Sequence, residues 1–162
     1  MKYEMNFNQN DNSNNKENNN DNFPLAALIS IIYRTHNTHL NHLIERFNLT
    51  AGQIPFILHL LNKENISQDD LANDLFIDKG TVAIALRKLE DEGFVERKKS
   101  EENRRKYIIF FTPKGRKVAL KIEKLNNHWE NKLLNEFSSF EKKEFMKKIR
   151  MLSLKSIEIM KE

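Results

Sequence analysis

The sequence predicts a mainly α-helical fold with one small β-hairpin, in which long helices flank a compact central module. Glycine and proline are scarce, with 4 and 3 copies in 162 residues, so little of the chain favours loops. Apolar residues recur at intervals of three and four over most of the chain, which is the period of an amphipathic helix. Two short runs, 94–99 and 107–111, have instead the β-branched and aromatic content of strands.

The first part of the chain is expected to change from a tail to helices near residue 23. Residues 1–22 are dominated by asparagine and have few aliphatic side chains, so we predict a disordered tail. A long helix follows over about 24–47. A capping box of Thr50 and Gln53 starts the next helix. Pro55 falls at the fifth residue of that helix, beyond the tolerated first turn, and predicts a local irregularity.

Two short helices separated by a tight turn are predicted in the middle of the chain. Ser67 and Asp70 form a cap pair for a helix over about 68–75. Asp78 caps a second helix over about 79–92.

The two predicted strands flank a polar tip and therefore form a hairpin. Thr112 then caps a long helix, with proline at its first position. A capping box at Ser138 and Glu141 interrupts the apolar stripe and starts the last helix.

Helix, short helix, turn, short helix and hairpin follow one another in the order of a winged helix-turn-helix. In that module the second short helix enters the major groove of DNA. Ile84 lies at the centre of its outward face, where an isoleucine is unexplained without a partner, and a thymine methyl group would contact it. The predicted DNA-binding residues are Ser67, Gln68, Lys79, Gly80, Thr81, Ala83, Ile84, Arg87, Lys88, Arg104, Arg105 and Lys106.

Several motifs lie in one continuous register between residues 66 and 115. They are Leu71-Ala72, Thr81-Val82, Leu89 to Gly93 followed by Arg97, and Asn103-Arg104-Arg105 followed by Phe111-Thr112-Pro113-Lys114-Gly115. In this register the segment resembles the MarR family of transcriptional regulators. Asn103 stands where the family has an aspartate that orients the wing arginine. Ala83-Ile84 stands where the family usually has polar or basic side chains, so the family's base contacts do not transfer to these positions.

The resemblance implies a homodimer that reads a palindromic operator and acts as a repressor. It also implies that a small, often phenolic, ligand binds where the dimerisation helices meet the winged module, for which Tyr33, His36, Phe56 and His59 are the candidate residues. Three long apolar stripes support the dimer independently, because they exceed what one small module needs to cover it. The expected organisation is a tail (1–22), supporting and dimerisation helices (23–64), the winged module (65–112) and C-terminal dimerisation helices (113–162).

The sequence leaves one alternative function and argues against several kinds of site. A winged-helix interaction module of the transcription machinery, without its own DNA specificity, is the alternative. His36, His39 and His42 recur at a spacing that metal ligands use, but they drift around the helix, and we predict no metal site and no cofactor. The sequence has no cysteine, no phosphate-binding loop and no nucleophile motif, so we expect no enzyme and no thiol sensor. No apolar run reaches membrane-spanning length, and we expect a cytoplasmic protein.

Overall fold

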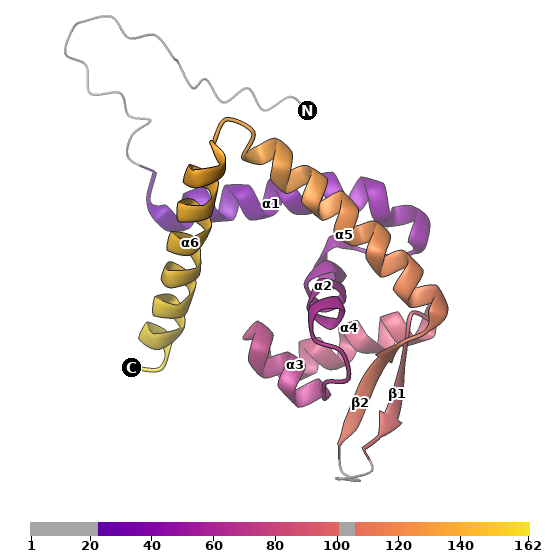
Figure 1. Ribbon diagram of the computed structural model, residues 1–162. Coiled ribbons are helices and arrows are strands. Elements are labelled where there is room, and N and C mark those ends of the chain that lie inside the picture. The colour runs from indigo at the N-terminus through magenta and orange to yellow at the C-terminus, as the bar shows by residue number, and fades with distance from the viewer. Residues whose placement is uncertain (1–22, 101–105) are drawn as a thin grey trace, which may run out of the picture.

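A computed structural model describes residues 23–100 and 106–162 of the chain. Figure 1 shows a mainly helical molecule with one antiparallel hairpin, as predicted. The elements in chain order are α1 (Leu25–Ile44), the 3-10 turns η1 (Glu45–Phe47) and η2 (Ala51–Gln53), α2 (Ile54–Asn62), α3 (Gln68–Leu75), α4 (Lys79–Asp91), β1 (Val95–Lys99), β2 (Tyr107–Phe111), α5 (Pro113–Leu133) and α6 (Ser139–Met160). No helix within the described ranges is long and apolar enough to cross a membrane.

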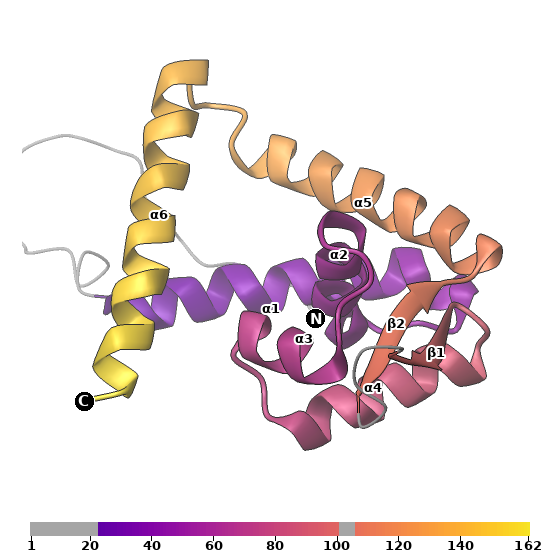
Figure 2. The same ribbon diagram turned by 60° about the horizontal axis from the view of Figure 1, so that its bottom comes forward.

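The helices divide into a winged module and a set of long helices. α3, α4 and the hairpin lie together at one end of the molecule, whereas α1 and α5 pack against each other at the other end (Figure 1). α2 lies between them and contacts both α3 and α5. α6 crosses the N-terminal end of α1 (Figure 2), and at its C-terminal end the ammonium of Lys161 lies 5.8 Å from the centre of the Phe76 ring, directly after α3.

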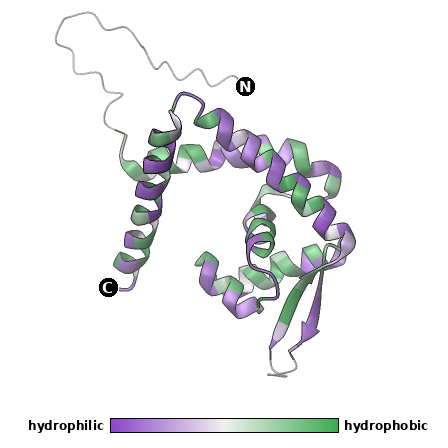
Figure 3. Cartoon of the chain, in the orientation of Figure 1, coloured by the Kyte–Doolittle hydropathy of each residue, from purple (hydrophilic) through white to green (hydrophobic). Residues whose placement is uncertain are grey.

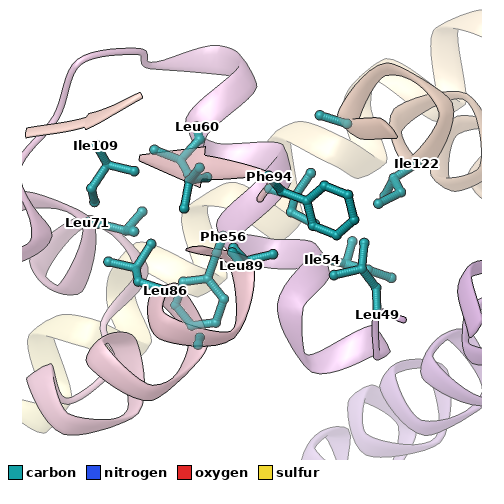
Figure 4. Close-up of a cluster of buried hydrophobic side chains, with 14 of the residues drawn as sticks. Leu49, Ile54, Phe56, Leu60, Leu71, Leu86, Leu89, Phe94, Ile109 and Ile122 are labelled. Atoms are coloured by element: carbon teal, nitrogen blue, oxygen red, sulfur yellow. The ribbon is translucent and has the colours of Figure 1, made fainter. Parts of the chain in front are cut away.

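One apolar core joins the winged module to α1, α2 and α5. Leu71 from α3, Leu86 from α4, Ile109 from β2 and Ile122 from α5 are all essentially inaccessible, and Figure 4 shows them around Phe56. Burial of a side chain of this size contributes about 1.5–3 kcal/mol, so the winged module is fixed to α5 by packing. α6 contributes no buried residue to this core.

The first two helices deviate from the prediction where their backbone changes type. α1 ends at Ile44 rather than near 47, because a 3-10 turn follows and Asn48 takes the left-handed conformation with φ 56°. The predicted capping box is present at Thr50, but it opens the 3-10 turn η2 before α2 begins. Pro55 therefore falls in the first turn of α2, where a proline is tolerated, and not at the fifth residue; the change of backbone type lies before it, between η2 and α2.

β2 is paired along both of its edges, on one side with β1 and on the other with the segment that precedes α3. β1 and β2 pair in antiparallel register from Val95 opposite Phe111 to Lys99 opposite Tyr107. On its other edge β2 receives a short extra pairing, in which the amide of Ile109 donates to the carbonyl of Ile66 at 3.0 Å. The hairpin is therefore held against the start of α3 as well as against the end of α4.

The start of α5 lies in close contact with the end of α4. The hydroxyl of Thr112 accepts a hydrogen bond from the amide of Gly115 at 2.9 Å and donates one to the carbonyl of Gly93 at 2.7 Å. A Cβ atom at Gly115 would lie 1.8 Å from the carbonyl oxygen of Phe94, so no other residue fits there without a backbone movement. The predicted capping box at Ser138 is likewise present and starts α6.

Candidate nucleic-acid interface

The N-terminus of α4 is fixed by the cap that the sequence predicts. The carboxylate of Asp78 accepts hydrogen bonds from the amide of Thr81 at 2.8 Å and from its hydroxyl at 2.6 Å. These two bonds lower the pKa of Asp78, because they stabilise the ionised carboxylate. The hydroxyl of Thr81 is thereby oriented at the exposed start of the helix.

The two faces of α4 are those that the sequence predicts. Val82, Leu86 and Leu89 are fully buried and hold the helix on the core. Ile84 lies on the opposite face and is 63% exposed. A large aliphatic side chain is therefore displayed at the centre of a helix surface that has no covering element among the described residues.

The charges around Ile84 are of two kinds. Arg87 and Lys88 are exposed, and neither makes an ion pair with any other residue in the described ranges. Lys79 is also exposed, but its ammonium group lies 2.9 Å from the carboxylate of Asp69 in α3. The outward surface thus offers two uncompensated cations beside the isoleucine and a third that α3 partly neutralises.

Ser67 does not lie where a DNA contact requires it. It is 2% exposed, its hydroxyl donates to the carboxylate of Asp70 at 2.6 Å, and it accepts from the amide of the same residue at 3.1 Å. The prediction that Ser67 contacts DNA is therefore corrected: the residue caps α3 and lies under the edge of β2. The bond from Ser67 is the main reason why the pKa of Asp70 is lowered, and nearby Lys106 lowers it further.

A shallow depression lies between the start of α3 and the start of β2. It has a volume of ≈ 180 Å³ and is lined by Gln68, Asp69, Lys106 and Tyr107 together with Ser67. Gln68 is half-buried, whereas Lys106, directly before β2, is exposed. The depression therefore brings Gln68 and Lys106 together.

The hairpin is connected to α4 by an ion pair. The guanidinium group of Arg97 in β1 donates through Nε to a carboxylate oxygen of Glu90 at 3.0 Å, and its terminal nitrogen bonds the same oxygen. The bond from Glu90 raises the pKa of Arg97. The predicted contacts Arg104 and Arg105, and Asn103 beside them, lie outside the described residues.

The four candidate ligand residues separate into three places. Tyr33 and His36 line an apolar groove of ≈ 500 Å³ between α1, the end of α5 and α6. Phe56 is 2% exposed and belongs to the core, so its prediction as a ligand contact is corrected. His59 lies on a different surface, with Nε2 3.0 Å from the carboxylate of Asp74.

Aromatic residues of α5, of α6 and of the turn between them complete the groove. They were not among the predicted ligand contacts. His36 donates or accepts a hydrogen bond at 2.9 Å with the side chain of Asn126, and its ring lies edge-on to Trp129 at 4.6 Å. Phe137 and Phe145 stack at 5.5 Å on the opposite wall. The apolar stripes of the last two helices were visible in the sequence, but not their convergence on α1. Within the described ranges no group of three or more histidine, aspartate or glutamate side chains could hold a metal ion.

Comparison with known proteins identifies the family. The family model described as "MarR family" matches residues 49–107. An uncharacterized HTH-type transcriptional regulator of Bacillus subtilis, YybA, is 31% identical over 114 residues, which are 70% of this chain and 76% of that protein. The chain belongs to the MarR family.

Other MarR relatives extend the similarity to the whole fold. The HTH-type transcriptional regulator BilQ of Clostridium symbiosum is 29% identical over 109 residues, covering 67% of this chain and 76% of that protein. The crystal structure of a MarR transcriptional regulator from Methanosarcina mazei covers 83% of this chain and 97% of its own, with a TM-score of 0.77 and 32% identity. This protein is therefore a winged helix-turn-helix transcriptional regulator and not an enzyme.

One structural neighbour of the MarR family was solved with DNA. A putative regulator from Listeria monocytogenes, complexed with a 26mer DNA, has a TM-score of 0.77 over 82% of this chain and 89% of its own. Its identity of 22% makes this a likeness of fold.

Proposed function

We propose that this MarR-family protein is a homodimeric repressor that binds a palindromic duplex operator in the cytoplasm and is released from it by a small ligand. The exposed isoleucine on α4 carries the proposal of sequence-specific binding. Ile84 is 63% exposed beside Arg87 and Lys88, which form no ion pair within the described ranges; a solvated helix does not need this combination, whereas it suits a major groove.

Each group on α4 has a distinct expected role. A thymine methyl group is the apolar feature of the major groove, so Ile84 supplies discrimination among bases. Arg87 reaches a guanine edge or a phosphate, and Lys88 and Lys106 contact phosphates, which fix register without carrying sequence information. Gly80 and Ala83 present almost no side chain, which allows the backbone of α4 to approach the groove closely.

The dimer is supported by apolar surface that one chain leaves uncovered. α6 has no buried residue, although Phe140, Met151 and Leu154 are apolar and more than half exposed. Apolar residues also recur along the N-terminal half of α1, which α6 crosses (Figure 3). A second copy related by a two-fold axis covers both helices and places two recognition helices about 34 Å apart, as a palindrome requires.

The apolar groove supports a ligand-dependent response. Tyr33 and His36 are its polar groups, and the remaining lining is aromatic or aliphatic, which suits a small aromatic compound with one hydroxyl group. Because α1, α5 and α6 all line the groove, a ligand that prefers one arrangement of these helices shifts the spacing of the two winged modules. The binding of such a ligand is coupled to DNA binding by the same free energy in both directions.

Selection of duplexes from a random pool, followed by fluorescence anisotropy, tests the proposal. We expect a palindromic consensus with two half-sites, a protein that sediments as a dimer, and an affinity that falls steeply with salt. Ile84→Ala is expected to relax the base preference at one position of each half-site, by about 1–3 kcal/mol, and to leave the melting temperature nearly unchanged.

Leu120→Ala is the matched control, because Leu120 is an exposed aliphatic residue of α5, at 45%, outside the proposed interface. It should change neither specificity nor affinity. A monomeric protein that selects no sequence and binds no duplex would contradict the proposal and favour a protein-interaction module. Equal specificity of the Ile84→Ala variant and the wild type would show that the isoleucine reads no base.

A further inference from the structure

One side of α5 carries a continuous row of basic side chains that the proposed operator contacts do not use. At 100° per residue these side chains fall within a sector of about 80°, and all of them are exposed. We call them the α5 basic stripe: Lys114, Lys117, Lys121, Lys124, His128 and Lys132. The acidic residues of α5, Glu123 and Glu130, lie on a different side of the helix, so they do not neutralise the stripe.

The stripe opposes the local preferences of an α-helix. The first turn of α5 holds no acidic residue, although the positive end of the helix dipole favours acids and disfavours the lysines that are present. Successive lysines at intervals of three and four also repel one another. Lys117, Lys121 and Lys124 make no ion pair with any residue of the described ranges. An arrangement that weakens its own helix in two ways requires a compensating anionic partner.

The stripe is continuous with other cations and with the winged module. The guanidinium carbon of Arg46 lies 4.9 Å from the centre of the Phe47 ring, and the ammonium of Lys121 lies 5.7 Å from the same centre. This ring therefore joins Arg46 of η1 to the stripe. At the start of the stripe, Lys114 donates to the carbonyl of Glu92 at 2.6 Å, at the C-terminal end of the recognition helix α4.

The position of the stripe decides which anion it can meet. β2 leads directly into α5, so the stripe starts at the end of the hairpin that is opposite to its tip (Figures 1 and 2). A duplex lying on α4 and the hairpin and continuing past the edge of the module therefore meets the stripe only if it bends towards α5. From Lys114 to Lys124 the stripe spans about 15 Å, long enough to follow several phosphates of one strand.

We propose that the α5 basic stripe binds the DNA that flanks the operator and bends it around the outer side of the winged module. This inference rests on the proposed function, since it requires the operator to be bound first. The contacts are to phosphates, so they lengthen the footprint and add affinity without adding sequence specificity. The contacts between the stripe and these phosphates offset the free-energy cost of bending the flanking duplex.

Two duplexes that carry the same selected operator test the inference. One ends at the operator, and the other extends it by about 15 base pairs on each side. We expect the full-length wild-type protein to bind the longer duplex about tenfold more tightly, with a salt dependence that steepens by about 0.9 for each additional phosphate contact. Energy transfer between dyes at the ends of the longer duplex should report a bend.

The variant Lys117→Gln/Lys124→Gln removes two charges of the stripe while keeping the good helix propensity of these positions and the contact of Lys121 with Phe47. We expect it to bind the short duplex like the wild type and to lose most of the gain on the long one. Lys143→Gln/Lys147→Gln is the matched control, because it likewise removes two exposed lysines, from α6 instead of α5. This control should retain the gain and the bend.

The outcomes separate this inference from the function on which it rests. If the stripe variant keeps the full gain and the full bend, the flanking contact is refuted. If it weakens the short duplex as much as the long one, the lysines belong to the operator contact and the inference is wrong. If the wild type fails to bind the short duplex at all, the proposed function itself fails. Binding of anionic vesicles by the wild type, lost in the stripe variant while the length effect persists, would assign the stripe to a lipid surface instead.

Discussion

Gly115 lies where the first turn of α5 passes the backbone of Phe94, and its replacement by alanine sets two effects against each other. Helix propensity alone predicts that Gly115→Ala stabilises the protein by about 1 kcal/mol. The structure predicts the opposite sign. The added Cβ atom would lie 1.8 Å, 2.6 Å and 2.8 Å from three backbone atoms of Phe94, none of which can rotate away as the end of a side chain could.

The magnitude follows from the movement that the clash requires. Ordinary contact begins near 3.4 Å, so α5 and the Phe94 carbonyl must separate by about 1.6 Å. That separation breaks the bonds from Thr112 to the carbonyls of Phe94 and Gly93, which measure 3.0 Å and 2.7 Å. Two lost bonds at about 1 kcal/mol each and overpacking of about 1–3 kcal/mol outweigh the helix gain. We expect a net loss of about 3 kcal/mol.

Urea unfolding followed by circular dichroism measures this loss. With a slope of about 2 kcal/mol per molar, the midpoint should fall by about 1.5 M. Wild type and variants are compared at one protomer concentration, because dimerisation couples stability to concentration. Gly52→Ala is the matched control, since its Cβ atom would meet only a side-chain oxygen at 3.9 Å. A Gly115→Ala midpoint equal to or above the wild type would refute the steric reasoning.

Three further outcomes are expected. The hydrogen bond from Lys63 is the main reason why the pKa of Asp74 is lowered from its usual 3.8. The ionised carboxylate therefore contributes its full stabilisation above pH 3.8, and this contribution disappears as the pH falls through the lowered pKa. The difference in urea midpoint between wild type and Asp74→Asn should be present at pH 7 and vanish in acid. Glu90→Gln weakens the ion pair with Arg97 and should reduce DNA affinity, measured by anisotropy, while costing less than about 1 kcal/mol in urea unfolding. Phe76→Gly should raise the thermal midpoint by a few degrees, because Phe76 has φ 53° and glycine adopts this conformation at no steric cost. A lower midpoint would mean that packing of the Phe76 ring outweighs the backbone strain.

Local signals in the sequence predicted most of the helix boundaries. Thr50, Ser67, Asp78, Thr112 and Ser138 all precede helical turns, because a side-chain oxygen satisfies amides that lie close in sequence. The apolar and exposed faces of α4 followed from helical periodicity for the same reason. Features that depend on neighbours within four residues are visible without a structure.

The errors concern contacts between distant segments. Ser67 was predicted to contact DNA, but β2 covers it from about 40 residues further along the chain, which no local pattern reveals. Phe56 and His59 are three residues apart on one short helix, yet one faces the core and the other faces Asp74. Tyr33 and His36 were expected where the dimerisation helices meet the winged module, but the groove that they line takes its other walls from the end of α5 and from α6, whose docking depends on the tertiary fold.

The packing of α1 against α5 also determines how the chain can fold while it is being synthesised. The buried residues Leu40 and Ile44 of α1 leave the ribosome long before Ile122 of α5, whose helix packs against them. At about 5–20 residues per second, the roughly 80 residues between Ile44 and Ile122 take about 4–16 seconds to make. During that interval the buried face of α1 lacks the helix that completes its packing, so the core cannot close until α5 has been made.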